Sequence, residues 1–154
     1  MALSSNPFIK ILVPIDGSKN ADKALSEALA ICEKFGSKLI LIHVISDFIL
    51  DYSTTAEGFQ IPNTTVIKIR KETREHAQKM MKERLLKAQE KKINCKSIII
   101  IGDSGSEIIN YAKNEDVNLI VMGARGLGKI KQLLLGSVSN KVVIGSPCPV
   151  LIVK

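Results

Sequence analysis

The sequence predicts an α/β protein in three layers, with a five-stranded parallel sheet and helices on both of its faces. Five short apolar runs alternate along the 154 residues with segments whose apolar residues recur at helical spacing. Such alternation places the strands in one parallel sheet with right-handed connections. The hydrophobic content is 45% and the aromatic content only 4%, which indicates aliphatic packing. The length suffices for one core, so we expect residues 1–154 to form a single domain.

The first strand and helix have clear boundaries. Phe8–Ile15 is almost entirely apolar, as expected of a central strand that is buried on both faces. Ser18 or Asn20 can cap the helix that follows. Apolar residues recur at helical spacing over 21–35, and Gly36 then ends the helix in the usual C-terminal position.

The middle of the chain predicts a strand, a long connection and a long helix. Lys38–Ile45 is the second strand, and a polar connection over 46–65 follows it. The helix covers about 66–92, and Asn94 ends it. Its apolar residues gather on one side and predict a core-facing stripe of Ala77, Met80, Met81, Leu85 and Ala88.

The second half of the chain repeats the alternation with shorter elements. The predicted elements are a strand over 95–101, a short helix after the turn at 102–106, a strand over 118–122, a helix from 137 to about 144 and a strand over 150–153.

The formal net charge of +7 is concentrated in the long helix. Residues 66–92 contain ten Lys or Arg and four Glu, a surplus of six. Charges at i,i+4 spacing, such as Glu75 and Lys79, are typical of a solvated helix face. No aromatic residues that would stack on bases lie among these cations. We therefore expect an exposed helix face, with a surface for nucleic acid as the minor alternative.

The sequence predicts a cytoplasmic protein without a membrane segment. No apolar run approaches the roughly 18 residues of a membrane span. The first residues lack the basic and apolar regions of a secretory signal. Cys32, Cys95 and Cys148 are odd in number, dispersed and without metal-ligand spacing, so we expect reduced thiols.

A glycine-rich segment after the fourth strand suits a phosphate group. Gly123, Gly126 and Gly136 are followed by Ser137, where a helix can begin. Glycine lets backbone N–H groups approach an anion, and the free amides of a helix N-terminus favour negative charge. The segment is not a P-loop, because GxxxxGK[ST] occurs nowhere in the chain. The dinucleotide pattern GxGxxG also fails, because Lys131 stands where its third glycine belongs.

This spacing, Gly-x2-Gly-x9-Gly-Ser, resembles the nucleotide-binding signature of the universal stress protein family. The opening Pro14-x-Asp16-Gly-Ser and the ending Pro149-Val150-Leu151 extend the resemblance over nearly the whole chain. The resemblance implies an adenine nucleotide alpha hydrolase-like (Rossmann-like) fold with strand order 3-2-1-4-5. It also implies a stress-response regulator that binds ATP or another adenine nucleotide, with Mg²⁺ or Mn²⁺ held mainly by the phosphates.

That strand order predicts the position of the binding site. The direction of winding reverses between the first and fourth strands, and ligands of open α/β sheets bind beyond the strand ends at such a point. The residues expected there are Pro14, Ile15, Asp16, Val44, Met122, Gly123, Arg125, Gly126, Gly136, Ser137, Val138 and Ser139.

The roles of these residues differ in how they are supported. Asp16 can bond adenine, ribose or a metal, or it can simply fix the Asp-Gly turn. Val44, through its backbone, is implied by the resemblance alone. Gly136, Ser137, Val138 and Ser139 are expected to form an anion cup from helix N-terminal amides and the two hydroxyls.

The sequence favours a binding protein over an enzyme. His43 and His76 are the only histidines, and no carboxylate follows or precedes either at a sequence spacing that indicates a catalytic pair. We predict no catalytic residue and no metal ligand set from the protein. A slow metal-dependent ATPase and a nucleotide-independent dimeric interaction module are the alternatives, and the protein partner is unknown.

The final strand predicts a homodimer. Val150–Val153 is apolar throughout, and its place at the chain end predicts that it forms a sheet edge. An open apolar edge invites pairing with another chain, and pairing about a twofold axis would close it. Dimerisation through this strand also agrees with what the family resemblance implies.

Overall fold

Five parallel strands form the centre of the structure in the predicted order β3-β2-β1-β4-β5. The computed structural model describes residues 6–46, 62–127 and 135–154. The predicted connection over 46–65 therefore lies mostly outside the described residues. The strands are β1 (Lys10–Pro14), β2 (Lys38–Ser46), β3 (Cys95–Gly102), β4 (Leu119–Gly123) and β5 (Val150–Val153).

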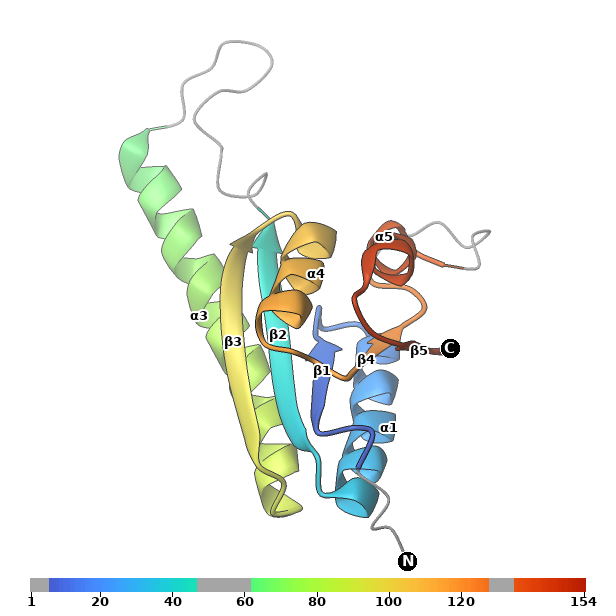
Figure 1. The fold of residues 1–154 in the computed structure, drawn as a ribbon. Coiled ribbons are helices and arrows are strands. Elements are labelled where there is room, and N and C mark those ends of the chain that lie inside the picture. Colours follow the sequence, from blue (N-terminus) through green and yellow to red (C-terminus); the bar gives the residue numbers. More distant parts are fainter. Residues whose placement is uncertain (1–5, 47–61, 128–134) are drawn as a thin grey trace, which may run out of the picture.

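Helices cover both faces of this sheet, as predicted. They are α1 (Lys19–Phe35), α3 (Asn63–Glu90), α4 (Ser104–Asn114) and α5 (Ser137–Gly145). Helices α1 and α3 lie on one face, and α4 and α5 lie on the other (Figure 1).

Two apolar cores, one on each face of the sheet, follow from the alternation of side chains along the strands. In β1, Ile11 and Val13 pack into the core with α1 and α3, whereas Leu12 packs into the core with α4 and α5. All three side chains are fully buried. The central strand is therefore covered on both faces, which explains its nearly continuous apolar sequence.

Helix α1 begins and ends where the sequence predicts. The Ser18 hydroxyl accepts a hydrogen bond of 3.1 Å from the Ala21 N–H, so Ser18 and not Asn20 is the N-cap. Gly36 has a left-handed φ of 67°, and its N–H donates to the Cys32 carbonyl at 2.8 Å. Glycine adopts this conformation without a steric penalty, so the helix stops there.

The boundaries of α3 differ from the prediction at both ends. The helix begins at Asn63, three residues early, because the Pro62 carbonyl already accepts hydrogen bonds from Thr65 and Val66. It ends at Glu90 and is followed by Lys92 in a left-handed conformation with φ 56°, whereas we expected the helix to reach about 92 and Asn94 to end it. The first strand is also shorter than predicted, since Lys10–Pro14 replaces Phe8–Ile15.

Arg84 of α3 is buried, which corrects the prediction that the cations of this helix are all solvated. Its guanidinium donates to both carboxylate oxygens of Asp22, at 2.8 and 3.1 Å, and to the Met80 carbonyl at 3.0 Å. The other nine cations between 66 and 92 are exposed. The predicted stripe of Ala77, Met80, Met81 and Ala88 is buried as expected, and Leu85 is half-buried.

Two ion pairs join α3 to α1, and they differ in exposure. The Arg84 and Asp22 side chains are 11% and 39% exposed, whereas those of Lys91 and Glu33 are 45% and 44% exposed. In the first pair the planar guanidinium is therefore bidentate and mostly buried, although its carboxylate partner reaches solvent, and the second pair is largely solvated.

We predict that Asp22→Ala lowers the free energy of unfolding by about 2 kcal/mol, because it leaves the buried guanidinium without its carboxylate. The control, Glu33→Ala, removes the solvated pair between the same two helices and should cost under about 1 kcal/mol. Urea denaturation of both variants measures the difference. Equal losses of unfolding free energy would show that the Arg84–Asp22 pair stabilises the packing of these helices no more than the Lys91–Glu33 pair.

Candidate functional site

A cavity of about 410 Å³ opens beyond the carboxyl ends of β1 and β4. All twelve residues that the sequence nominated line this one cavity, although they come from three separate parts of the chain. Seven further lining residues were not predicted: Ser18, Ala21, Ile42, Ser104, Ile108, Leu127 and Leu135.

The cavity exists because β1 and β4 separate at their ends. These two strands pair only at Ile11 with Leu119 and at Leu12 with Ile120. Beyond that point β1 continues along β2, where the Ile15 N–H donates to the Ile42 carbonyl at 2.8 Å. Strand β4 continues along β5 as far as the pairing of Gly123 with Val153. The separation leaves the crevice that the strand order predicts.

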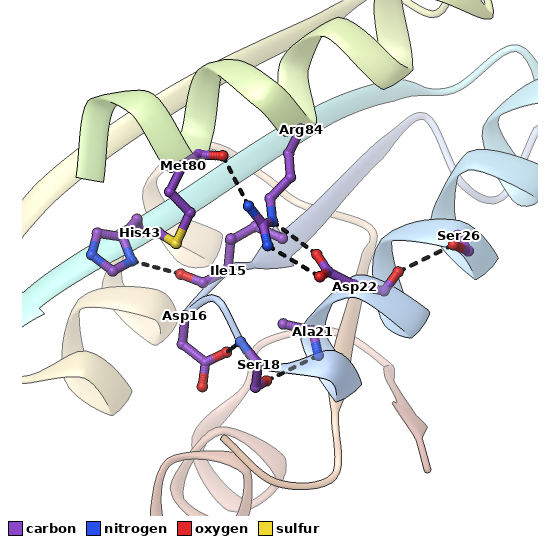
Figure 2. A network of polar contacts seen from close by, with 9 residues as sticks. All are labelled: Ile15, Asp16, Ser18, Ala21, Asp22, Ser26, His43, Met80 and Arg84. Atoms are coloured by element: carbon purple, nitrogen blue, oxygen red, sulfur yellow. Dashed lines mark hydrogen bonds and ion pairs between the residues drawn. The ribbon is translucent and has the colours of Figure 1, made fainter. Parts of the chain in front are cut away.

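Asp16 performs the turn role that its sequence context suggested. One carboxylate oxygen accepts a hydrogen bond of 2.9 Å from the Ser18 N–H, and Gly17 between them has φ 85° (Figure 2). The second oxygen faces Gly126 across the cavity, so closely that a Cβ on Gly126 would meet it. The turn therefore fixes one oxygen of Asp16 and leaves the other directed at the glycine loop.

His43 serves as a structural support for the end of β1. Its Nδ1 donates to the Ile15 carbonyl at 2.7 Å, which assigns the hydrogen to Nδ1 (Figure 2). This bond occupies the carbonyl that would otherwise continue the ladder to Val44. His76, the second histidine, is exposed on α3 and does not line the cavity.

Val44 has unpaired backbone groups on the cavity side. Residues two apart along a strand present their N–H and C=O groups to the same side. Since the Ile42 carbonyl bonds to Ile15, Val44 also faces the side of β1, beyond the last paired residue of that strand. No backbone partner for Val44 lies on that side among the residues that the structure describes.

The ends of the glycine loop are tied to the sheet. The Ala124 N–H donates to the Val153 carbonyl at 2.7 Å, and the Gly136 N–H donates to the Ala124 carbonyl at 2.8 Å. The Ser139 hydroxyl also donates to the Ala124 carbonyl, at 2.8 Å. Lys129 and Lys131, the cations of this loop, lie outside the described residues.

Ser137 and Ser139, whose hydroxyls were both expected to serve an anion, are placed differently. Ser139 is buried and its hydroxyl is committed to the Ala124 and Gly136 carbonyls, so it secures the loop. Ser137 is exposed at the start of α5. Among the described residues no side chain caps this helix, which leaves the N–H groups of its first turn open to the cavity.

Gly123 has a packing requirement of its own, in addition to its place in the cavity lining. A Cβ at this position would lie 2.8 Å from the Asn20 backbone carbon, closer than real Cβ contacts. At Gly136 the nearest atom to an added Cβ is the Ser139 hydroxyl oxygen at 3.5 Å, an ordinary contact. The two glycines of the signature therefore have different physical reasons for being glycine.

The candidate metal ligands among the described residues are dispersed, and two of the cysteine thiols are protonated. No three His, Cys, Asp or Glu side chains there gather in a way that could hold a metal ion. Burial raises the pKa of the Cys32 thiol to about 11 and that of Cys95 to about 12. Both are therefore protonated at neutral pH and are poor nucleophiles. No described helix has both the length and the apolar character needed to cross a membrane.

Comparison with known proteins gives one consistent family. A family model described as "Universal stress protein family" matches residues 7–154 of this chain. Universal stress protein YxiE of Bacillus subtilis is 37% identical over 147 residues, covering 96% of this chain and 99% of its own. The solved structure of MJ0577 from Methanocaldococcus jannaschii has a TM-score of 0.84 and 30% identity, covering 96% of each chain.

Two solved structures with the same fold are described as nucleotide complexes. A universal stress protein in complex with cAMP has a TM-score of 0.64 and 22% identity, and covers 95% of this chain and 96% of its own. The universal stress protein from Archaeoglobus fulgidus in complex with dAMP has a TM-score of 0.64 and 16% identity, with coverages of 96% and 98%. At these identities the likeness concerns the fold.

We predict that Gly123→Ala lowers the free energy of unfolding by about 2 kcal/mol, because the new methyl group overlaps the Asn20 backbone. The matched variant Gly136→Ala should leave stability within about 0.5 kcal/mol of the wild type, since its Cβ finds room. Chemical denaturation compares the two. A Gly123→Ala variant as stable as the wild type would show that α1 does not pack against the end of β4 in this way.

Proposed function

The chain belongs to the universal stress protein family, and we propose that it is a cytoplasmic regulator that binds ATP with Mg²⁺ or Mn²⁺. The single observation that carries the proposal is the lining of the cavity, which combines apolar side chains with glycines, an arginine and the start of a helix. We group these residues by chemistry into an apolar half, made of Pro14, Ile15, Ile42, Val44 and Ile108, and an anion half, made of Arg125, Gly126, Gly136, Ser137 and Val138. A base fits the first and phosphates fit the second.

The apolar half suits adenine for a specific reason. The aliphatic side chains from β1, β2 and α4 offer a flat base an apolar environment. Val44 adds one unpaired backbone N–H and one C=O on the cavity side. A donor and an acceptor on one strand edge match the alternating N6 donor and N1 acceptor of adenine, whereas guanine offers O6 and N1–H in the opposite sense.

The anion half combines three sources of positive potential. The first-turn N–H groups of α5 face the cavity, and the helix dipole favours a negative group there. The Arg125 guanidinium makes no hydrogen bond or ion pair with the rest of the described chain, so it is available to a phosphate. Gly126 and Gly136 add no side chain that would fill this space.

A divalent cation fits this site only as a companion of the phosphates. Asp16 directs one carboxylate oxygen at Gly126, on the border of the anion half. One carboxylate is too few ligands for Mg²⁺ by itself, which usually keeps several waters and takes phosphate oxygens as ligands. Bound there, the cation would neutralise phosphate charge beside Asp16. This arrangement also makes a slow ATPase the second candidate function.

The cAMP and dAMP complexes support an adenine nucleotide as the ligand of this fold. The twelve site residues of this chain surround one cavity in an arrangement suited to the same chemical class. We extend the proposal to a single universal stress protein domain over 1–154, of which the family model matches 7–154. Its output would be a nucleotide-dependent change in affinity for a protein partner.

The proposal also includes a homodimer built on β5. This strand lies at the sheet edge and pairs with β4 alone. The Pro149 and Val153 carbonyls accept hydrogen bonds from the side of β4, so Val150 and Ile152 present their backbone groups to the free edge. Leu151 and the nearby helix residues Val143 and Ile144 are exposed apolar side chains. Pairing of two copies would satisfy the open edge.

Calorimetric titration of nucleotide-free protein with ATP and Mg²⁺ is expected to show saturable binding, with GTP at least tenfold weaker. The same titration of Gly126→Val and Gly136→Val should show no binding, because their side chains enter the anion half. Circular dichroism verifies that the variants are folded. Absence of heat with ATP at millimolar concentration would refute the proposal, and phosphate release measured alongside distinguishes the ATPase.

Arg125→Ala is predicted to weaken ATP by about tenfold and adenosine hardly at all, because the guanidinium meets phosphate and not the base. Arg74→Ala serves as the control, since Arg74 is an exposed cation on α3 that does not line the cavity. Comparable losses for both variants would mean that Arg125 acts only through the overall charge.

Val150→Pro is predicted to convert the dimer to monomer while leaving the sheet intact, because it removes an N–H from the free edge of β5 only. Val150→Ala keeps that N–H and should remain dimeric. Sedimentation velocity at tens of micromolar protein (roughly, well above a tight dissociation constant) measures both. A monomeric wild type under these conditions contradicts the dimer.

A further inference from the structure

We propose that the hydroxyl of Ser104 hydrogen-bonds the base of the bound nucleotide and contributes to the choice of base. This inference rests on the proposed function, since it adds a specificity-determining residue to the same cavity. Ser104 belongs to α4, which contributes no residue to the glycine signature or to the Asp16 turn.

Ser104 lies on the side of α4 that faces the apolar half. It is the first residue of the helix, and Ile108 follows one turn later on the same face. Ile108 is 3% exposed and packs in the core that contains Ile42 and Val44, all of which line the cavity. Ser104 therefore extends the wall made by Ile108 toward the open end of the cavity.

The Ser104 hydroxyl has no hydrogen-bond partner among the described residues. A serine at a helix start usually serves as the cap, but here Asp103 is the cap. The Asp103 carboxylate accepts hydrogen bonds from the Ser106 N–H at 2.9 Å and from the Ser106 hydroxyl at 2.7 Å. Ser104 makes no side-chain hydrogen bond with any residue that the structure describes.

The start of α4, where Ser104 lies, also contacts α5 through an exposed ion pair. Lys141 of α5 donates to Asp103 at 2.5 Å and thereby joins the N-terminus of α4 to α5. The hydrogen bonds from Lys141 and Ser106 hold the pKa of Asp103 well below its usual range, so the contact persists at any pH near neutrality. Gly105 leaves room for the Lys141 stem, whose Cδ would lie 2.6 Å from an added Cβ.

The surroundings give one hydroxyl a large effect on affinity. Ser104 is the polar side chain beside the apolar half on the α4 side of the cavity, where the described neighbours are aliphatic. A hydroxyl both donates and accepts, so it can complement either edge atom of adenine that Val44 leaves unbonded. Without the hydroxyl, a polar atom of the base would be buried in this site without a hydrogen-bond partner. The hydroxyl therefore discriminates strongly between bases that can and cannot bond to it.

The test compares Ser104→Ala with the wild type in calorimetric titrations against four nucleotides. These are ATP, 2′-deoxy-ATP, 7-deaza-ATP, which lacks N7, and purine riboside triphosphate, which lacks the N6 amino group. Ser104→Ala should bind ATP and 2′-deoxy-ATP about five- to tenfold more weakly than the wild type. With at least one of the two base analogues, the wild type and the variant should bind equally.

Ser106→Ala is the matched control, because it removes a hydroxyl two residues away that does not line the cavity. Its ATP affinity should equal that of the wild type. Unchanged ATP binding by Ser104→Ala would overturn the inference. A loss of affinity that disappears only with 2′-deoxy-ATP would also overturn it, as would a loss that persists with every analogue. If the wild type binds ATP in these experiments, the proposed function still holds even when the Ser104 inference fails. If the wild type binds no nucleotide, the proposed function itself is refuted.

Discussion

The site depends on one constraint of the sheet, the separation of two adjacent parallel strands at their carboxyl ends. The chain leaves β1 for α1 on one face and leaves β4 toward α5 on the other face. Because these two connections run to opposite faces of the sheet, β1 and β4 stop pairing after Leu12 and Ile120. Backbone groups at the strand ends, the start of α5 and the glycine loop therefore meet around one cavity. In the proposed function, the groups that bind the nucleotide are mostly backbone groups placed by the fold.

Side chains around the cavity mainly hold this opening in shape. His43 secures the end of β1, and Ser139 secures the loop after β4. The Asp103–Lys141 contact joins α4 to α5, and the Arg84–Asp22 pair joins α3 to the first turns of α1 (Figure 2). The His43 and Ser139 contacts are made to the lining residues Ile15 and Gly136, whereas the Asp103–Lys141 pair is exposed. The side chains that support the cavity wall thus have hydrogen-bond partners of their own. The backbone donors on that wall can therefore stay unpaired without loss of this support.

The sequence predicted the elements and most of the residues that line the cavity, for identifiable reasons. Periodicity and capping residues such as Ser18 and Gly36 are local signals, and the spacing around Gly136 is a short motif. The strand order came from the family resemblance, because no local signal fixes which strands are neighbours. Arg84 was missed since its partner, Asp22, is 62 residues away and nothing in α3 distinguishes it from the other cations. Ser104 was missed because the motif does not extend to α4.

The most direct test of the account is nuclear magnetic resonance of the backbone amides during titration with ATP and Mg²⁺. The account predicts that the largest changes in amide chemical shift belong to Val44, Gly126 and the first turn of α5, with small changes on the exposed face of α3. Those groups are the unpaired donors that the separated strands expose. Large changes confined to α3, with none at Val44 or α5, would contradict the account, because the nucleotide would then bind through charge on the helix surface rather than between the strands.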